Sequence, residues 1–187
     1  MILDIFEIPL NKKHWSIASK RVLEIPIYKG SHRGLNANQV GSLGEVVFEE
    51  FLELNKIRFS DQRNLTTHDY LINKKITVDV KTKDRTARPL GFFDNSVPIY
   101  NHQHQRPNYY YFISLLRNKL DKSSNISRFT HAFILGATEI LTLEKIGKKW
   151  KAGEIDNSNG TRFWTDCINI KINQLIRNKE MIKVLKK

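Results

Sequence analysis

An acid and a lysine, Asp79 and Lys81, stand two residues apart in the run ITVDVKTK at residues 76–83. The run alternates between two sets of side chains, which predicts a half-buried strand on which Asp79 and Lys81 point the same way. A carboxylate can hold a divalent cation, and an ammonium beside it can stabilise negative charge or orient an attacking water. Such a pair suits the hydrolysis of a phosphodiester. The alternative interpretation is a solvated strand face.

A second acid, Asp69, lies in residues 68–72, which we expect to be the partner strand, joined by a polar turn at residues 73–75. A three-residue turn pairs Ile72 with Ile76 and sets Asp69 directly across from Asp79, with Cβ atoms roughly 5 Å apart. A two-residue turn would put the two acids on opposite faces, because a slip of one residue inverts the facing of a strand. A longer, looser loop is a third alternative, because a three-residue turn usually has glycine at its left-handed position, where Lys75 would stand. Two carboxylates so placed repel one another unless a cation joins them. The site hypothesis is therefore also a prediction of register.

A third acid, Glu45, lies in residues 42–55, where apolar residues recur at helical spacing. Ser42 and Glu45 have the spacing of a capping box, which predicts a helix that begins at Ser42 and gives Glu45 a structural role. In the functional interpretation, Glu45 leans over the strand pair as an outer metal ligand or water-orienting group. The two roles are compatible.

The motifs GSLGE at 41–45, HDY at 68–70 and VDVKT at 78–82 together resemble the PD-(D/E)XK nuclease superfamily, also called restriction-endonuclease-like. The apolar runs 109–115 and 131–136 are similar to the later strands of its core, so the resemblance spans about residues 41–136. His68 stands where the family name would place proline. The implied fold is an α/β protein with elements in the order helix, strand, strand, strand, helix, strand. Its central mixed sheet would have roughly four to five strands, flanked by helices.

The resemblance also implies a role for each of these residues. Asp69 and Asp79 would ligate Mg²⁺, for which Mn²⁺ can substitute, together with the backbone carbonyl of Val80. Lys81 would be the catalytic lysine, and Glu45 would be the acid supplied by the helix, as a catalytic residue and metal ligand.

The implied activity is that of a DNA endonuclease, such as a phage, restriction or homing enzyme, acting on double-stranded DNA. A homodimer is expected if both strands are cut, because one metal site cuts one strand at a time. An exonuclease or Holliday-junction resolvase on the same fold is an alternative. A third interpretation is a noncatalytic nucleic-acid-binding protein in which Asp79 and Lys81 only pair with each other.

The composition independently favours a polyanionic partner. The chain has 31 Lys and Arg residues against 19 Asp and Glu residues, a formal net charge of +12, and a pI near 9.8. A basic surface alone also suits a ribosomal or purely binding protein. Charge therefore supports the class of partner and leaves the chemistry open.

A long segment, residues 84–108, separates the Asp79 strand from the next apolar run. It interleaves arginines with aromatic residues, so it would grip substrate by binding phosphates and stacking on bases. The other interpretation is a surface excursion whose aromatic residues fill a satellite core. The candidate nucleic-acid contacts are Lys83, Arg85, Arg88 and Arg106.

One domain covering residues 1–187 is expected, because the chain is long enough to bury one core. We divide it into an N-terminal extension (1–40), a core with the catalytic motif (41–136), and a C-terminal strand and basic helix (137–187), with Asn173 as the cap of that helix. The chain has no apolar run of about 18 residues and no signal-peptide pattern, so we expect no membrane contact and a cytoplasmic protein. The single cysteine, Cys167, excludes an intramolecular disulfide.

Overall fold

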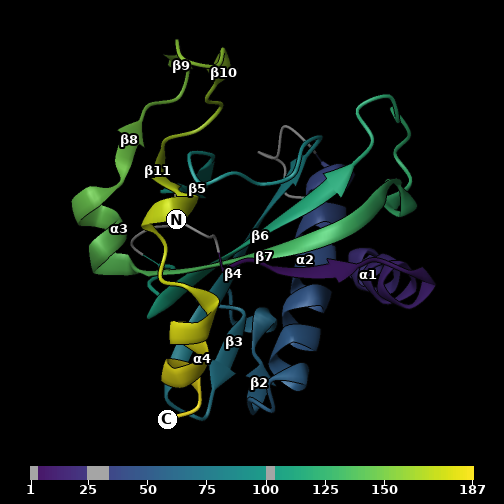
Figure 1. The fold of residues 1–187 in the computed structure, drawn as a ribbon, viewed down its shortest axis with the longest axis vertical. Coiled ribbons are helices and arrows are strands. Elements are labelled where there is room, and N and C mark those ends of the chain that lie inside the picture. Colours follow the sequence, from purple (N-terminus) through teal and green to yellow (C-terminus); the bar gives the residue numbers. More distant parts are fainter. Residues whose placement is uncertain (1–3, 25–33, 100–103) are drawn as a thin grey trace.

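The computed structural model describes residues 4–24, 34–99 and 104–187, and these form an α/β fold around a mixed sheet (Figure 1). The strand order in the sheet is β1-β7-β6-β4-β3-β2. The neighbouring strands β4 and β6 are parallel, and every other neighbouring pair is antiparallel. The strands are β1 (Phe6–Pro9), β2 (Phe59–Asp61), β3 (Tyr70–Ile72), β4 (Ile76–Arg85), β6 (Tyr109–Arg117) and β7 (Phe129–Glu139). The expected α/β class with a mixed sheet is confirmed, with six strands rather than the four to five expected.

Three helices, α1 (Lys12–Glu24), α2 (Leu35–Leu54) and α4 (Asn178–Leu185), cover one face of this sheet. Helix α2 buries an apolar stripe that includes Phe48 and Phe51, and both rings lie against Tyr111 of β6. Val78 and Val80 of β4 belong to the same core. The alternation of β4 therefore points its valines toward α2 and turns Asp79 and Lys81 to the opposite face.

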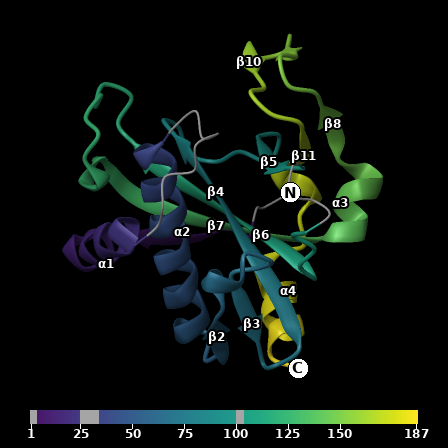
Figure 2. The same ribbon diagram turned by 180° about the vertical axis from the view of Figure 1, so that it is seen from behind.

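The opposite face carries a second core beneath a small sheet of strand order β5-β11-β8 (Figure 2). Its strands are β5 (Asp94–Pro98), β11 (Cys167–Lys171) and β8 (Lys148–Trp150), and helix α3 (Ile140–Ile146) lies beside them. A short arm beyond β8 contains β9 (Ile155–Asp156) and β10 (Thr161–Arg162). Single 3₁₀ turns occur at Arg63–Leu65, Ile126–Arg128 and Ile172–Gln174. Asp79 and Lys81 thus lie between the main sheet and this small sheet.

The segment between β4 and β6 differs from the helix that the resemblance implies. Within its described residues, 86–99 and 104–108, it contains strand β5 and no helix. Pro89 and Pro98 interrupt this segment, and proline is unfavourable inside a helix. Strand β5 pairs instead with β11 from the far end of the chain. The described part of the segment therefore does not supply the second helix of the element order that the resemblance implies.

The prediction that a helix begins at Ser42 is also wrong. Helix α2 begins at Leu35, and Ser42 is buried within it, where its Oγ donates a hydrogen bond to the carbonyl of Ala18 at 3.2 Å. Residues 35–41 continue the helical turn, so Glu45 lies in the middle of the helix rather than in its first turn. The predicted cap at Asn173 fails similarly, because α4 begins at Asn178 with Arg177 before it.

Candidate active site

The β3–β4 hairpin has the register that the sequence predicts. Tyr70 pairs with Val78 and Ile72 pairs with Ile76, which leaves three residues in the turn. The turn is tight because Asn73 and Lys74 both adopt left-handed backbone angles, with φ of 47° and 59°. Of the turn lengths that the sequence leaves open, the structure has the three-residue turn that the site hypothesis requires.

This register brings Asp69 to the position across from Asp79, where the pairing of β3 with β4 ends. The backbone N–H of Asp69 donates to the Val78 carbonyl at 3.0 Å. The Asp69 carboxylate accepts a hydrogen bond from the Val80 N–H, with Oδ2 to N at 2.6 Å. A main-chain donor of β4 thus fixes the orientation of this side chain.

Asp69 lies in an environment that disfavours its negative charge. Burial raises the pKa of its carboxyl well above the ordinary value, and the charges of Asp79 and Glu45 raise it further. The Val80 hydrogen bond and the Lys81 ammonium act in the opposite direction without cancelling these effects. A cation placed among these carboxylates would relieve the repulsion.

Asp79 and Lys81 share one face of β4, as the alternation predicts. The Lys81 Nζ lies 2.6 Å from Asp79 Oδ2, and the Asp79 side chain is only 2% exposed whereas that of Lys81 is 22% exposed. Burial acts to lower the pKa of Lys81, but the charge and hydrogen bond of Asp79 outweigh it, so the pKa of Lys81 is raised. Lys81 is therefore protonated at neutral pH.

Tyr110, on the neighbouring parallel strand, lines the same site. Its register partner is Asp79, and its ring centroid lies 5.7 Å from the Lys81 Nζ. Burial, followed by the charge of Asp79, raises the pKa of Tyr110 to about 12. Tyr110 was not singled out from the sequence, because its position beside Asp79 depends on the parallel pairing of β4 with β6.

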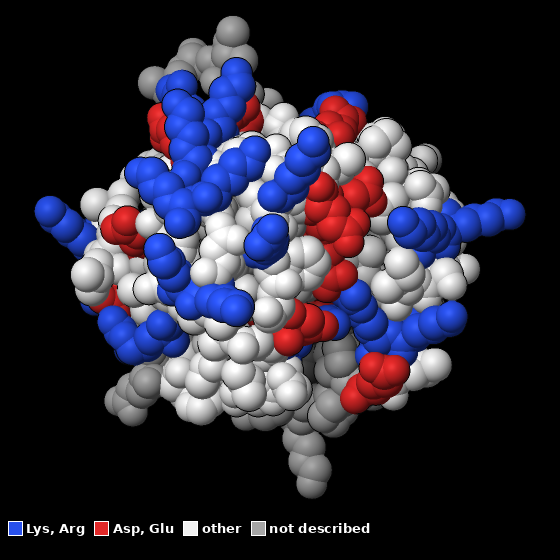
Figure 3. All heavy atoms as spheres, turned by 90° about the horizontal axis from the view of Figure 1, so that it is seen from below, with Lys and Arg blue, Asp and Glu red and all other residues white. Residues whose placement is uncertain are grey.

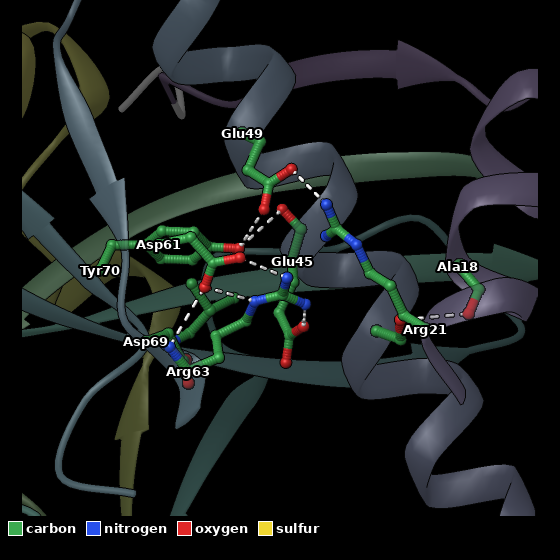
Figure 4. Close-up of polar contacts among 10 residues, drawn as sticks. Ala18, Arg21, Glu45, Glu49, Asp61, Arg63, Asp69 and Tyr70 are labelled. Atoms are coloured by element: carbon green, nitrogen blue, oxygen red, sulfur yellow. Dashed lines mark hydrogen bonds and ion pairs between the residues drawn. The ribbon is translucent and has the colours of Figure 1, made fainter. Parts of the chain in front are cut away.

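The carboxylate of Glu45 is bound by an arginine that sequence reasoning missed. Arg63 Nη1 lies 2.7 Å from Glu45 Oε2, and Arg63 Nη2 lies 2.5 Å from Asp61 Oδ2 (Figure 4). Burial raises the pKa of Glu45, and the Arg63 hydrogen bond and charge partly oppose this. Glu45 is close enough to Asp69 for its charge to raise the pKa of Asp69, yet its hydrogen bond goes to Arg63.

A close approach between α2 and β4 sets the position of Glu45. A Cβ added to the neighbouring residue, Gly44, would lie 1.9 Å from Thr82 Oγ1 and 2.8 Å from Thr82 Cβ. Both distances are shorter than real carbon contacts, so the helix rests against the strand only because residue 44 has no side chain. Gly44 is therefore a structural requirement of the site.

The described residues contain no group of three or more His, Cys, Asp or Glu side chains arranged to hold a metal ion. The expected set of Asp69, Asp79 and Glu45 is therefore not assembled as a protein-only cage. Mg²⁺, however, is typically bound by one or two carboxylates together with waters and substrate phosphates. Two opposed carboxylates and the carbonyl of Val80 fit that donor chemistry.

The four residues expected to contact nucleic acid all have partners within the protein. Lys83 Nζ donates to the Asp94 carbonyl at 3.4 Å, and Arg85 donates to the same carbonyl at 2.7 Å. Burial lowers the pKa of Arg85 to about 10. On the surface, Arg88 forms two contacts of 2.8 Å with Glu7, and Arg106 lies 3.0 Å from Glu144.

A cavity of about 860 Å³ lies beside this site, toward the small sheet and the β9–β10 arm. Phe92, which is 64% exposed, and Phe93 contribute aromatic surface to it, and Asp94 and Asp156 are its acidic residues. Its basic lining residues are Lys83, Arg85, Lys148 and Lys171. Sequence reasoning singled out the first two; Lys148 and Lys171 come from the small sheet, and only the tertiary fold brings them to the cavity.

The excess of basic residues is also visible on the end of the molecule that carries the β3–β4 turn and α4. Seen from that end, basic side chains are spread over much of the face, and acidic side chains gather in a band near its middle (Figure 3). Exposed lysines at this end include Lys74, Lys75, Lys179 and Lys183.

Comparison of the chain with models of known protein families and with curated proteins gives no match. Within residues 4–24, 34–99 and 104–187, no helix is long and apolar enough to cross a membrane.

Proposed function

We propose that the protein is a metal-dependent deoxyribonuclease that hydrolyses phosphodiester bonds with Asp69, Asp79 and Lys81. One observation carries the proposal. The β3–β4 register sets two carboxylates across from each other, and a protonated lysine lies 2.6 Å from one of them. The pKa of Asp69 is raised well above its ordinary value, and groups with perturbed pKa values cluster at functional sites.

The arrangement of elements also supports this class. Helix α2 is followed by the three antiparallel strands β2, β3 and β4, and then by β6 parallel to β4. This is the order expected for the restriction-endonuclease-like core, apart from the crossover helix, whose place is taken by a segment with strand β5. Asp69 directly precedes β3, and Asp79 and Lys81 lie on β4, so the motif residues occur in the order that the resemblance implies.

In the proposed reaction, Asp69, Asp79 and the Val80 carbonyl would hold Mg²⁺, and Mn²⁺ would substitute. A bound divalent ion lowers the pKa of its water and offsets negative charge on the phosphate. The Val80 N–H orients Asp69 through its 2.6 Å hydrogen bond. Because the pKa of Lys81 is raised, its side chain would act as a fixed positive charge beside the phosphate rather than as a general base.

Glu45 has a supporting role in this proposal. Its carboxylate lies near Asp69 but is hydrogen-bonded to Arg63 at 2.7 Å. We therefore assign it to the electrostatic surroundings of Asp69 and not to direct contact with the metal. Double-stranded DNA is the proposed substrate, and a homodimer would allow both strands to be cut.

A second candidate function is noncatalytic binding of nucleic acid, and one observation favours it. The Asp79 carboxylate is 2% exposed and already paired with Lys81, which is the geometry of a structural ion pair. In that case the basic surface would bind nucleic acid and the acids would only stabilise the fold.

Nicking of a supercoiled plasmid separates the two functions. The wild type should nick the plasmid in Mg²⁺ or Mn²⁺, and Asp79→Asn and Lys81→Ala should lose nicking while they keep DNA binding in a gel-shift assay. Absence of nicking by the folded wild type would favour the binding protein. Linear, circular and four-way-junction DNA, compared with the same preparation, would distinguish an endonuclease from an exonuclease or a resolvase.

A further inference from the structure

A small cavity lies between β4 and β5, next to Lys81 of the proposed active site. Its volume is about 160 Å³, and it is lined by Lys81, Thr82, Lys83, Asn95, Ser96 and Phe112. We call it the β4–β5 pocket. Pockets for drug-sized molecules usually measure about 300–1,000 Å³, so this one suits a small ion or a single functional group rather than a nucleobase.

Asn95 presents a buried hydrogen-bond donor that has no acceptor. The residue is 2% exposed, and its Oδ1 accepts a hydrogen bond from Arg85 Nη2 at 3.3 Å, which fixes the orientation of the amide. Its Nδ2 has no hydrogen-bond partner in the described structure. A buried donor without an acceptor is unfavourable, and such groups in folded proteins call for a specific explanation. An acceptor bound in the β4–β5 pocket supplies one.

Lys83 adds a positive charge that is not neutralised by an ion pair. Its Nζ donates to the backbone carbonyl of Asp94 at 3.4 Å, and among the described residues no carboxylate lies within ion-pair distance of it. Lys81 lines the same pocket from two residues earlier on the strand. Side chains with this spacing on one strand face lie roughly 7 Å apart along the strand. The pocket therefore combines the Lys83 ammonium and the Asn95 amide donor, and it is also lined by Lys81, whose own ammonium is paired with Asp79.

We propose that the β4–β5 pocket binds a phosphate group of the nucleic acid, next to the phosphate that is cleaved at Asp79 and Lys81. A phosphate offers several acceptor oxygens and a negative charge, which match an amide N–H and two lysines. The identification of the ligand as nucleic acid rests on the proposed function, whereas the anion-binding chemistry rests on the pocket. Lys83 also lines the 860 Å³ cavity with Phe92, so a strand could continue from the pocket onto an aromatic surface.

Asn95→Asp is the most direct test, because aspartate keeps the acceptor for Arg85 but replaces the free donor with a negative charge. The binding of inorganic phosphate is measured by isothermal titration calorimetry without divalent metal. Wild-type protein should bind phosphate saturably, Asn95→Asp should weaken binding at least tenfold, and Lys83→Met should weaken it severalfold. Lys119→Met, at an exposed lysine outside the pocket, should bind as the wild type does. Thermal unfolding establishes that each variant is folded.

The proposal is overturned if the wild type shows no saturable phosphate binding, or if Asn95→Asp and Lys83→Met bind phosphate like the wild type. Because this assay needs no cleavage, its result is independent of the nuclease assay. Plasmid nicking without phosphate binding would contradict the phosphate site and leave the proposed nuclease function standing. Asn95-dependent phosphate binding without nicking would support the phosphate site and contradict the nuclease function.

Competition identifies the source of the phosphate. A 5′-phosphorylated oligonucleotide and the same oligonucleotide with a 5′-hydroxyl are each used to displace inorganic phosphate. Displacement by both indicates a backbone phosphate, and displacement by the phosphorylated strand alone indicates a terminal one. Displacement by neither overturns the assignment to nucleic acid.

Discussion

The β3–β4 hairpin and the segment between β4 and β6 use charged residues in opposite ways. In the hairpin, Asp69 and Asp79 lie across from each other, and the one lysine of the site, Lys81, is paired with Asp79. In the segment, Arg88 pairs with Glu7 and Arg106 pairs with Glu144. Charges that pair one to one stabilise a fold modestly at most, whereas crowded like charges need another ligand. The comparison favours the hairpin, rather than the segment, as the place of the proposed chemistry.

The largest effect on cleavage should come from replacing one of the two opposed acids of the hairpin. We expect Asp69→Asn to lower metal-dependent cleavage by about 100-fold or more, the usual cost of removing a group that stabilises charge in the transition state. Asp61→Asn is the matched control, because Asp61 lies on the adjacent strand and pairs with Arg63. Initial rates of plasmid nicking give the comparison. Equal rates for the wild type and Asp69→Asn would remove Asp69 from the site.

The packing of α2 against β4 can be tested by substituting two glycines of this helix, Gly44 and Gly41. Gly44→Ala should destabilise the protein by about 1–3 kcal/mol, because the new Cβ overlaps Thr82. Gly41→Ala meets no atom within 4 Å and should stabilise the helix by up to about 1 kcal/mol. Urea unfolding of both variants measures the difference. If Gly44→Ala is as stable as Gly41→Ala, then α2 does not depend on this close approach.

We expect a smaller effect on cleavage from a substitution of Glu45, which is near an acid of the hairpin but is also paired with an arginine. Its carboxylate is near Asp69 but is bound by Arg63. Glu45→Gln keeps an acceptor for Arg63, so we expect cleavage to fall by less than about tenfold, within the range of a single exchanged hydrogen bond. Steady-state rates at saturating Mg²⁺ provide the measurement. A loss as large as that of Asp69→Asn would place Glu45 in direct contact with the metal.

The smallest effects should come from the surface arginines of the segment. Arg88→Ala and Arg106→Ala should change DNA affinity by about twofold, because each guanidinium is already engaged by a glutamate and exposed pairs contribute little. Fluorescence anisotropy at several salt concentrations would measure this. A tenfold loss for either variant would mean that its ion pair opens to contact DNA, and the contrast between the two regions would then fail.

The same contrast explains which features could be predicted from the sequence. Asp69, Asp79 and Lys81 lie within one hairpin, so alternation limited their register to a few turn lengths, and the structure has the three-residue turn among them. Arg88 and Glu7 are 81 residues apart, and Arg106 and Glu144 are 38 apart. No local pattern relates such positions, because their meeting depends on the whole path of the chain.

Other features of the fold could not be predicted from local sequence patterns, for related reasons. Helix α2 extends back to Leu35, so the serine and glutamate that suggested a cap lie inside the helix, where Ser42 bonds to Ala18. Arg63, which binds Glu45, comes from a short 3₁₀ turn that carries no periodic signal. Asn95 is placed beside Lys81 and Lys83 by the pairing of β5 with β11, a tertiary contact.

The central claim is that the opposed carboxylates of the hairpin serve metal-dependent phosphodiester hydrolysis. Plasmid nicking by the wild type and Asp79→Asn, with Mg²⁺ titrated from zero to millimolar, tests it most directly. We predict nicking that rises with Mg²⁺ in the wild type, disappears with a chelator, and is absent in Asp79→Asn at equal DNA binding. Nicking that is equal in the two proteins, or absent from the folded wild type in both Mg²⁺ and Mn²⁺, would contradict the claim.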